Sequence, residues 1–596
     1  MFASRTTSAP LGRLAGPALI LAAAAVATLP QMLGGVSCGH DYDFHLVSWI
    51  DCLDAWRHGL LYPHWASSAN FNAGEPRFVF YPPLTWMAGA ALGAVLPWTA
   101  ASIALTWLLF AASGLATRAL ARTVLSEPFA SLAGCIALCS GYSIFNAYER
   151  GAVAEMAGGF LLPLLLLYAL RDRRSEGRLL VRALDGSAAP LTLVVAACWL
   201  SNAPLGVMAS YLLAAFALAL ALTRRSWAPV LRAAVAAALG LALAGLYLVP
   251  AALEQKWIDV RQAVDDPGLA IQNSWLFARH LANPNLQLHD QELARVSAIA
   301  VVMIALALIG LAVAALRRKL PERSLWLPLA LIPAVALLLQ LPFSAPVWNL
   351  LPRLRYLQFP WRWLLAVQAP MGIFLALALQ SLLPHPGWLR RGALAASLVA
   401  LAVFALFTGR LYFQPCDEDD SVAGMMAVYS TGEAFPGVDE YAPPGADNLE
   451  LATNLPGACL TNSPTALLGQ HSEFPDTNPD WDADQGSCLS TAEWRGPSVE
   501  HRRIDTALPR SGYLVLRLRT YPAWTVTLND RPASPAATRD DGLYVFAVPA
   551  GPVHIAADWT TTPDALAGRC LSLVALLLLT TLCVIERQIC RSGLSL

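Results

Sequence analysis

Charged residues are scarce in this chain of 596 residues. Asp, Glu, Lys and Arg make up 14% of it, while hydrophobic residues make up 56%. An ordinary soluble domain has roughly 25% charged residues. The formal net charge is only −1, and the sequence has no basic stripe of the kind that nucleic-acid binding needs. The composition therefore excludes a large soluble core and a nucleic-acid-binding surface, and it indicates an integral membrane protein.

Metal-binding cysteine spacings are also missing, although the chain has 11 cysteines. One group lies in or beside apolar runs, where a thiol packs as a small hydrophobic side chain: Cys135, Cys139, Cys198, Cys570, Cys583 and Cys590. The others fall in segments that we place outside the cytoplasm, where disulfides can form: Cys38, Cys52, Cys416, Cys459 and Cys488. Among them we expect the pairs Cys38–Cys52 and Cys459–Cys488.

Apolar runs of spanning length are the main feature that the sequence does have. The first, residues 14–36, follows Arg5 and Arg13. We interpret it as a retained helix with a cytoplasmic N-terminus, and not as a cleaved signal peptide, because no polar mature start follows it. The other runs are 98–121, 127–146, 152–170, 190–204, 205–223, 228–252, 297–316, 325–343, 361–383, 393–413 and 566–586. Together they predict about twelve transmembrane helices.

Residues 84–96 are apolar but too few to span a bilayer. Counting them as a spanning helix would invert every later loop. We therefore predict a juxtamembrane or re-entrant helix here, followed by a break at Pro97.

The loops that this count places in the cytoplasm contain the basic clusters, as the positive-inside rule requires. These clusters are Arg118 and Arg122; Arg171, Arg173, Arg174, Arg178 and Arg182; Arg224 and Arg225; Arg317, Arg318 and Lys319; Arg390 and Arg391; Arg587 and Arg591. Because every cluster falls on one side, we expect both termini in the cytoplasm.

The chain divides into three parts on this basis. Residues 1–414 form a transmembrane domain, whose first external loop is 37–83. Residues 415–565 form an external soluble domain, and 566–596 form the last transmembrane helix with a cytoplasmic tail. From about residue 510 the external domain is β-rich and predicts a small antiparallel β-sandwich, with strands at Gly512–Arg519, Trp524–Leu528, Leu543–Val548 and Val553–Ala557.

Two carboxylates, Asp41 and Asp43, follow closely after the first helix. At the membrane surface a carboxylate can act as a base on an acceptor hydroxyl, or it can hold a divalent cation such as Mg²⁺ or Mn²⁺. The alternative is that both residues only cap the helix 44–57. Further along that helix, we expect Asp51 and Asp54 on a solvated face.

Other candidate binding residues lie in the external segments. His45 can serve as a ligand, although a loop histidine is more often simply hydrogen-bonded. Tyr81 belongs to an aromatic stretch, Phe78–Trp86, that is typical of the headgroup interface, and sugar stacking is the alternative role. The middle loop, about 253–296, offers charged residues to which the sequence assigns no geometry.

Arginines on the external side run against the positive-inside trend. Arg150 and Glu155 fall at a helix junction, where a buried charge faces a partner or a cavity. The alternatives there are a structural ion pair and a substrate contact. Arg362 lies between Trp361 and Trp363. It can bind a phosphate through its planar fork of donors or contact lipid headgroups.

Several of these segments resemble one family. The first loop contains Gly-His-Asp-x-x-Phe-His from Gly39, then Tyr62-Pro63-His64-Trp65, then Gly74-Glu75-Pro76-Arg77-Phe78 running to Tyr81-Pro82-Pro83-Leu84. Further matches are Arg150–Glu155, Leu357–Leu364, Tyr521–Trp524 and Val548–Gly551. These segments resemble the bacterial membrane proteins labelled 6-pyruvoyl-tetrahydropterin synthase-related, which belong to the wider GT-C glycosyltransferase superfamily.

The resemblance implies a GT-C type fold and the transfer of a sugar from a polyprenyl-phosphate donor to an envelope or extracytoplasmic acceptor. It places the protein in the bacterial inner (plasma) membrane, with the large domain external or periplasmic and with lipids as partners. It also implies that an acidic residue at the start of the first external loop lies at the reaction centre. Asp41 matches that position best, and Asp43 is the neighbouring candidate. The family label does not imply pterin chemistry, because the sequence offers no histidine triplet of zinc-binding spacing.

Two other functions stay open at the level of sequence. A transporter or flippase for a lipid-linked precursor would have ionisable residues inside the spans and internal repeats. The apolar runs are nearly free of charge and show no convincing repeat. A GT-C-like scaffold that has lost its chemistry is the other alternative.

Overall fold

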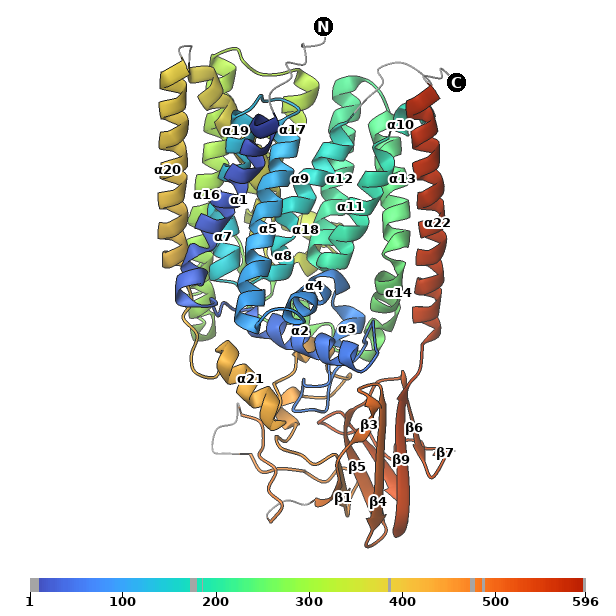
Figure 1. The fold of residues 1–596 in the computed structure, drawn as a ribbon. Coiled ribbons are helices and arrows are strands. Elements are labelled where there is room, and N and C mark those ends of the chain that lie inside the picture. Colours follow the sequence, from blue (N-terminus) through green and yellow to red (C-terminus); the bar gives the residue numbers. More distant parts are fainter. Residues whose placement is uncertain are drawn as a thin grey trace.

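The computed structural model describes residues 10–171, 179–184, 186–383, 387–471, 477–484 and 488–592. A bundle of long helices forms one part of the molecule, and a β-domain lies at one end of it (Figure 1). The first helix begins and the last helix ends at the opposite end of the bundle. Among the basic clusters, Arg173, Arg174 and Arg178 lie outside the described residues, as does Arg5.

Nine helical segments of the described residues are long and apolar enough to cross a membrane. They are α1 (Pro10–Gly34), α5 (Trp98–Ala121), α6 with α7 (Phe129–Leu138 and Gly141–Tyr148), α8 with α9 (Val153–Met156 and Gly158–Leu170), α12 (Ala203–Arg224), α16 (Gln287–Leu316), α19 (Leu364–Leu382), α20 (Gly387–Leu411) and α22 (Pro563–Ser592).

Two bent pairs raise this number to 11 if each pair is one span. The pair α13 (Ala228–Leu243) and α14 (Gly245–Leu253) is bent by 73°, and the pair α17 (Arg323–Leu339) and α18 (Ala345–Leu350) by 97°. The predicted run 190–204 corresponds to α11 (Ala188–Ser201), which has only 14 residues. Such a helix is about 21 Å long, shorter than the ~30 Å hydrocarbon core. A count of twelve spans is therefore not confirmed.

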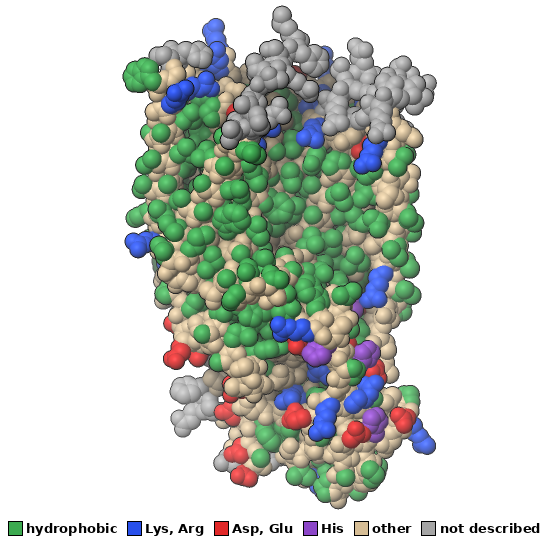
Figure 2. All heavy atoms as spheres, viewed as in Figure 1, with side chains coloured by type: hydrophobic (Ala, Val, Ile, Leu, Met, Phe, Trp, Pro, Cys, Tyr) green, Lys and Arg blue, Asp and Glu red, His purple; other side chains and the backbone are tan. Residues whose placement is uncertain are grey.

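The sides of the bundle are covered by hydrophobic side chains, and the charged residues of this face gather mainly at its two ends (Figure 2). Exposed leucine, valine and phenylalanine side chains are frequent on α16, α20 and α22. Exposing such an apolar surface to water would be unfavourable in free energy, whereas contact with lipid tails carries no such penalty. The protein is thus a polytopic α-helical membrane protein.

Short helices fill the space between the bundle and the β-domain (Figure 1). The first external loop folds into α2 (Tyr42–Arg57) and α3 (Arg77–Phe80), and the expected short helix before Pro97 is α4 (Pro83–Gly93). Helix α21 (Val422–Thr431) also lies on this side, whereas α10 (Leu179–Ala183) lies at the opposite end of the bundle. Helix α15 comprises Gln262–Asp265.

The β-domain is made of two antiparallel sheets, with strand orders β2-β1-β5-β8 and β3-β4-β9-β6-β7. Its strands are β1 (Ala458–Thr461), β2 (Leu489–Ala492), β3 (Arg495–Ser498), β4 (His501–Leu508), β5 (Gly512–Arg519), β6 (Trp524–Leu528), β7 (Arg531–Pro532), β8 (Leu543–Val548) and β9 (Gly551–Trp559). Three predicted strands have the predicted bounds, and the fourth is longer because β9 pairs with β4 along its whole length. Strands begin at Ala458, well before residue 510.

Two disulfides link the external segments. Cys459–Cys488 forms as predicted. The predicted Cys38–Cys52 pair is wrong, because Cys38 bonds to Cys416, 378 residues away in the sequence. Cys52 lies ten residues into α2 and is buried and free. It is about 15 Å along the helix from Tyr42, too far to reach Cys38.

Candidate functional site

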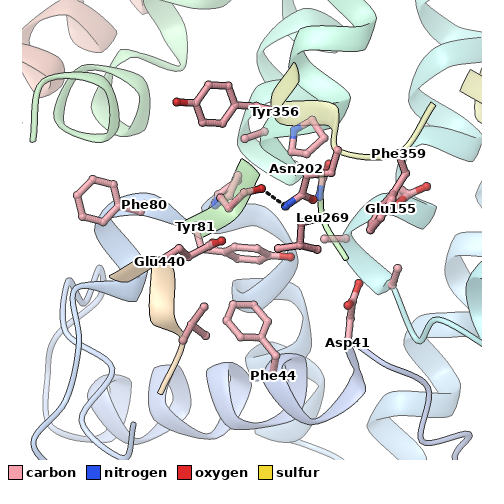
Figure 3. Close-up of a pocket in the computed structure, with 18 of the residues that line it drawn as sticks. Asp41, Phe44, Phe80, Tyr81, Glu155, Asn202, Leu269, Tyr356, Phe359 and Glu440 are labelled. Atoms are coloured by element: carbon pink, nitrogen blue, oxygen red, sulfur yellow. Dashed lines mark hydrogen bonds between the residues drawn. The ribbon is translucent and has the colours of Figure 1, made fainter. Parts of the chain in front are cut away.

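A cavity of about 860 Å³ lies where the bundle, the first external loop and the external domain meet. Figure 3 shows side chains from different parts of the chain converging on it. Six of the seven predicted site residues line the cavity: Asp41, His45, Tyr81, Arg150, Glu155 and Arg362. The seventh, Asp43, does not.

Asp41 occupies the N-cap position of α2 but does not cap it, since its side chain makes no hydrogen bond to the helix. Its carboxylate instead lies 3.5 Å from Nη2 of Arg150. The side chain is 42% exposed, and Figure 3 shows it reaching into the cavity. Helix capping therefore does not explain Asp41.

Backbone contacts hold Asp41 in this place. Its N–H donates to the carbonyl of Arg150 at 2.8 Å. Gly39 packs so closely on this segment that a Cβ atom there would approach the carbonyl oxygen of Glu149 to 2.5 Å. Gly151 has a φ of +61°, a conformation that glycine adopts at little cost. Gly39 and Gly151 thus allow the segment before α2 and the segment before α8 to lie in contact beside the carboxylate of Asp41.

Asp43 points away from the cavity. Its side chain is exposed, and Oδ1 accepts a hydrogen bond from the N–H of Phe44 at 2.7 Å. Successive positions of a helix differ by about 100° in direction, so two residues at the start of α2 face different sides. The structure brings Asp41 to the predicted site and leaves Asp43 outside it.

Glu155 is the centre of a buried ion cluster. Its Oε2 lies 2.6 Å from Nη1 of Arg150 and 3.0 Å from Nε of Arg362. Its Oε1 accepts a hydrogen bond from Tyr142 at 2.5 Å. Two arginines therefore share the carboxylate of Glu155, and Nε of Arg150 also lies 3.7 Å from Oε1 of Glu292, which lines the same cavity. Removing one partner of such a buried cluster would cost about 3–5 kcal/mol.

The two arginines of this cluster are further held by an aromatic ring. The guanidinium groups of Arg150 and Arg362 lie 5.4 Å and 5.1 Å from the centre of the Phe359 ring. Arg362 also donates from Nη1 to the carbonyl of Leu357 at 2.8 Å. Its Nη2 has no hydrogen-bond partner among the residues that the structure describes. Two N–H donors of Arg362 thus remain available to a ligand.

His45 and Tyr81 form the aromatic wall of the cavity near Asp41. Burial lowers the pKa of His45 to about 4, so the ring is neutral at pH 7, and it stacks on Trp49 at 6.3 Å. Tyr81 packs edge-on against Phe44 at 4.8 Å. Its ring crosses the cavity floor (Figure 3), where a sugar can stack on it.

A metal site made of protein ligands alone does not fit these residues. Of the predicted ligand pair only Asp41 faces the cavity. The described part of the chain holds no group of three or more His, Cys, Asp or Glu side chains placed to bind a metal ion. The predicted Mg²⁺ or Mn²⁺ therefore stays a prediction, and no step below uses it.

The external domain adds a wall that the sequence did not reveal. Val438, Glu440 and Tyr441 line the cavity from a segment without a recognisable motif. Burial raises the pKa of Glu440 to about 7. Figure 3 places Glu440 on the far side of Tyr81 from Asp41. Only tertiary contact with the first loop could have identified these residues.

That contact explains the second half of the first-loop motif. Glu75 is fully buried, and it binds Arg77 at 2.7 Å through Oε1. Its Oε2 accepts hydrogen bonds from Asn70 at 3.1 Å and from the N–H of Val438 at 3.0 Å. Glu75 and Arg77 are therefore structural, since they fasten the external domain to the loop that bears Asp41.

A second expectation about α2 is wrong. Asp51, expected on a solvated face, is only 3% exposed. Its Oδ2 accepts a long hydrogen bond of 3.3 Å from the N–H of Ser68. The residue is buried because the first loop folds back over this side of α2.

Comparison with known proteins places the chain in a family. A family model described as "6-pyruvoyl-tetrahydropterin synthase related domain; membrane protein" matches residues 78–412, more than half of the chain. The chain belongs to this family. No curated protein matches it.

Two solved structures are similar in fold to this family member. One is the arabinofuranosyltransferase AftD from Mycobacteria, with 19% identity and a TM-score of 0.43 over 80% of this chain and 32% of that one. The other is the archaeal oligosaccharyltransferase AglB from Archaeoglobus fulgidus, with 13% identity and a TM-score of 0.44 over 73% of this chain and 61% of that one. The chain thus corresponds to about a third of the first protein and three fifths of the second.

Proposed function

We propose that this protein is a membrane glycosyltransferase of the GT-C type, which transfers a sugar from a polyprenyl-phosphate donor to an envelope or extracytoplasmic acceptor. The observation that carries the proposal is the placement of Asp41. Its carboxylate enters a large cavity beside a buried cluster of two arginines and one glutamate. The similar proteins named above are themselves described as sugar-transferring enzymes.

The cavity supports a division of roles between its two charged groups. Sugar transfer needs a base that takes the proton of the acceptor hydroxyl, and Asp41 is the solvent-accessible carboxylate beside the arginine pair. The leaving phosphate carries negative charge as the bond to the sugar breaks. Arg362 has free N–H donors to offer it, and arginine binds phosphate oxygens in a bidentate manner.

The position of the cavity suits a substrate that is anchored in lipid. The cavity lies at the end of the bundle, next to the β-domain, so a phosphate at the membrane surface can enter it while its polyprenyl chain remains in the bilayer. We place this end on the external side of the bacterial inner membrane, with both termini in the cytoplasm.

The matched pair Asp41→Asn and Asp43→Asn tests the proposal. Both variants remove one carboxylate from the same turn, but only Asp41 faces the cavity. We expect transfer of labelled sugar from a polyprenyl phosphate in proteoliposomes to fall by about 10²–10⁴-fold in Asp41→Asn and to change less than threefold in Asp43→Asn. Equal activity of Asp41→Asn and the wild type would refute the assignment of the base.

Transport of a lipid-linked precursor is the rival that the same vesicles can test. Glu155 is an ionisable residue buried within a span, a feature that transporters share. Movement of a labelled lipid-linked sugar across the bilayer, without formation of a new glycosidic bond, would replace the transferase proposal by the transporter.

A further inference from the structure

A second, smaller cavity of about 240 Å³ lies outside the site described above. It is formed where the first external loop, α14, the end of β9 and the start of α22 meet. Its polar lining residues are Tyr62, His64, Glu254, Trp559, Thr562 and Arg569. None of these residues belongs to the proposed transfer site.

The cavity lies at the level where the last helix enters the membrane. Arg569 is six residues after Pro563, the first residue of α22, which corresponds to about 9 Å along the helix. Leu566 and Leu573 beside it are 57% and 62% exposed, as lipid-facing residues are. Arg569 is itself exposed. The cavity therefore opens beside a surface that lipids cover.

One end of the cavity is built to bind an anion. Nη2 of Arg569 lies 3.0 Å from Nε2 of His64. Because arginine can only donate, this ring nitrogen accepts, and Nδ1 of His64 donates to the buried Glu500 at 3.0 Å. The other N–H groups of Arg569 have no partner among the residues that the structure describes, so they can donate to a phosphate at the opening of the cavity.

The other end of the cavity suits a cation. Glu254 is 1% exposed, and its two oxygens accept hydrogen bonds of 2.5 Å from Tyr521 and Thr562. Each oxygen still has a lone pair for another donor. The ring of Trp559 lines the same cavity, where it stacks on His64 at 5.4 Å and on Tyr521 at 5.3 Å.

The floor of the cavity is rigid. Helices α14 and α22 cross so closely that a Cβ on Gly568 would meet the carbonyl oxygen of Gly245 at 2.4 Å. Oγ of Ser572 accepts a hydrogen bond from the N–H of Leu246 at 2.7 Å. Glu254, which directly follows α14, and Arg569, which lies on α22, are thus held in fixed positions by this helix crossing.

We infer that this second cavity binds the zwitterionic headgroup of a membrane phospholipid that bears a primary amine. Its phosphate binds Arg569 beside His64, and its ammonium group binds Glu254 beside Trp559. The acyl chains continue along the apolar face of α22. A lipid held in this way would fasten the β-domain to the membrane surface, because its headgroup contacts the loop, the domain and the helix at once.

Native mass spectrometry of the full-length protein after delipidation tests this inference. The probes are phosphatidylethanolamine, phosphatidylcholine and phosphatidylglycerol with identical acyl chains. We expect phosphatidylethanolamine to bind most tightly. Arg569→Gln should weaken its binding by about tenfold or more, as loss of a charged hydrogen bond does. The control, Arg410→Gln, changes an exposed arginine at the end of α20 that lines neither cavity and should have no effect.

A second variant tests the amine end. Glu254→Gln should remove the preference for phosphatidylethanolamine over phosphatidylglycerol while both lipids still bind through Arg569. Tighter binding of phosphatidylglycerol to the wild type, or equal affinities of the wild type and Arg569→Gln, would overturn the inference. Melting temperatures of all variants, measured without added lipid, show that a loss of binding is not a loss of folding.

Discussion

Two arginines bind the carboxylate of Glu155, and they differ in their other contacts. Arg150 is bound to Glu155 and also touches Asp41, so it links the buried cluster to the proposed base. Arg362 uses its Nε for Glu155 and keeps Nη2 unpaired within the described residues. We therefore expect Arg150 to position Asp41 and Arg362 to contact the donor.

The first prediction concerns the planar shape of Arg362. Arg362→Lys keeps the charge but loses the fork that holds Glu155 and a phosphate together. The transfer rate should fall by about 10–100-fold, equivalent to about 1.4–2.8 kcal/mol. Arg355→Lys is the control, because Arg355 is exposed and does not line the cavity. A similar effect of both substitutions on the rate would contradict this role.

The second prediction concerns Glu440, whose pKa is raised to about 7 by burial. Above pH 7 the group becomes negative and repels an anionic donor in the shared cavity. KM for the donor should therefore rise between pH 6 and pH 8, and Glu440→Gln should flatten this rise. Glu433→Gln, which changes an exposed residue outside the cavity, should leave the pH profile as it is. The measurement is the initial transfer rate at several pH values.

At the scale of the element, α2 carries two acids with opposite environments. Asp41 at its start meets a positive partner, whereas Asp51 in its middle is buried and forms no ion pair with the residues that the structure describes. Burial raises the pKa of Asp51 to about 6. A carboxyl group whose folded-state pKa lies above its unfolded value favours the folded state when it is protonated.

The third prediction follows from that sign. The contribution of Asp51 to stability should be fully present below about pH 4, where the group is protonated in both states, and should be lost as the pH rises towards 6. A pKa raised from 3.8 to about 6 corresponds to about 3 kcal/mol. Asp51→Asn should therefore reduce the fall in melting temperature between about pH 4 and pH 6. An unchanged pH dependence in Asp51→Asn would disprove the assignment.

At the scale of the whole molecule, the external domain and the first loop are joined by bonds between distant parts of the chain. Cys38–Cys416 fixes the segment just before Asp41 to the segment that follows α20. Glu75 binds the N–H of Val438. The cavity is complete only when the external domain is docked, because Val438, Glu440 and Tyr441 form one of its walls.

The fourth prediction compares the two disulfides. Cys416→Ser frees the segment that bears Asp41, so both the transfer rate and the melting temperature should fall. Cys488→Ser opens a bond inside the β-domain, far from Asp41 in the sequence, so stability should fall while the transfer rate per folded molecule stays within about threefold. A disulfide contributes about 2–4 kcal/mol in general. Equal loss of activity in both variants would contradict the positioning role of Cys38–Cys416.

Local pattern by itself determined most of the elements of this protein. Runs of apolar residues predicted the spans, because a helix in lipid is apolar on all sides. Alternation of apolar and polar residues predicted the strands Gly512–Arg519 and Trp524–Leu528 with the bounds that the structure has, because a strand buried on one face has a period of two residues. The span predicted at α11 is not confirmed, because this apolar helix has only 14 residues and is shorter than a bilayer.

Tertiary structure alone decided which residues form the site. The sequence favoured Asp41 only through a family resemblance and kept Asp43 as the neighbouring candidate, whereas in the structure Asp41 alone of the two lines the cavity and lies beside Arg150. Cys416 and Glu440 reach the first loop from hundreds of residues away. Such long-range contacts depend on how whole helices and domains pack against each other. The periodic pattern of residues within one segment does not predict them.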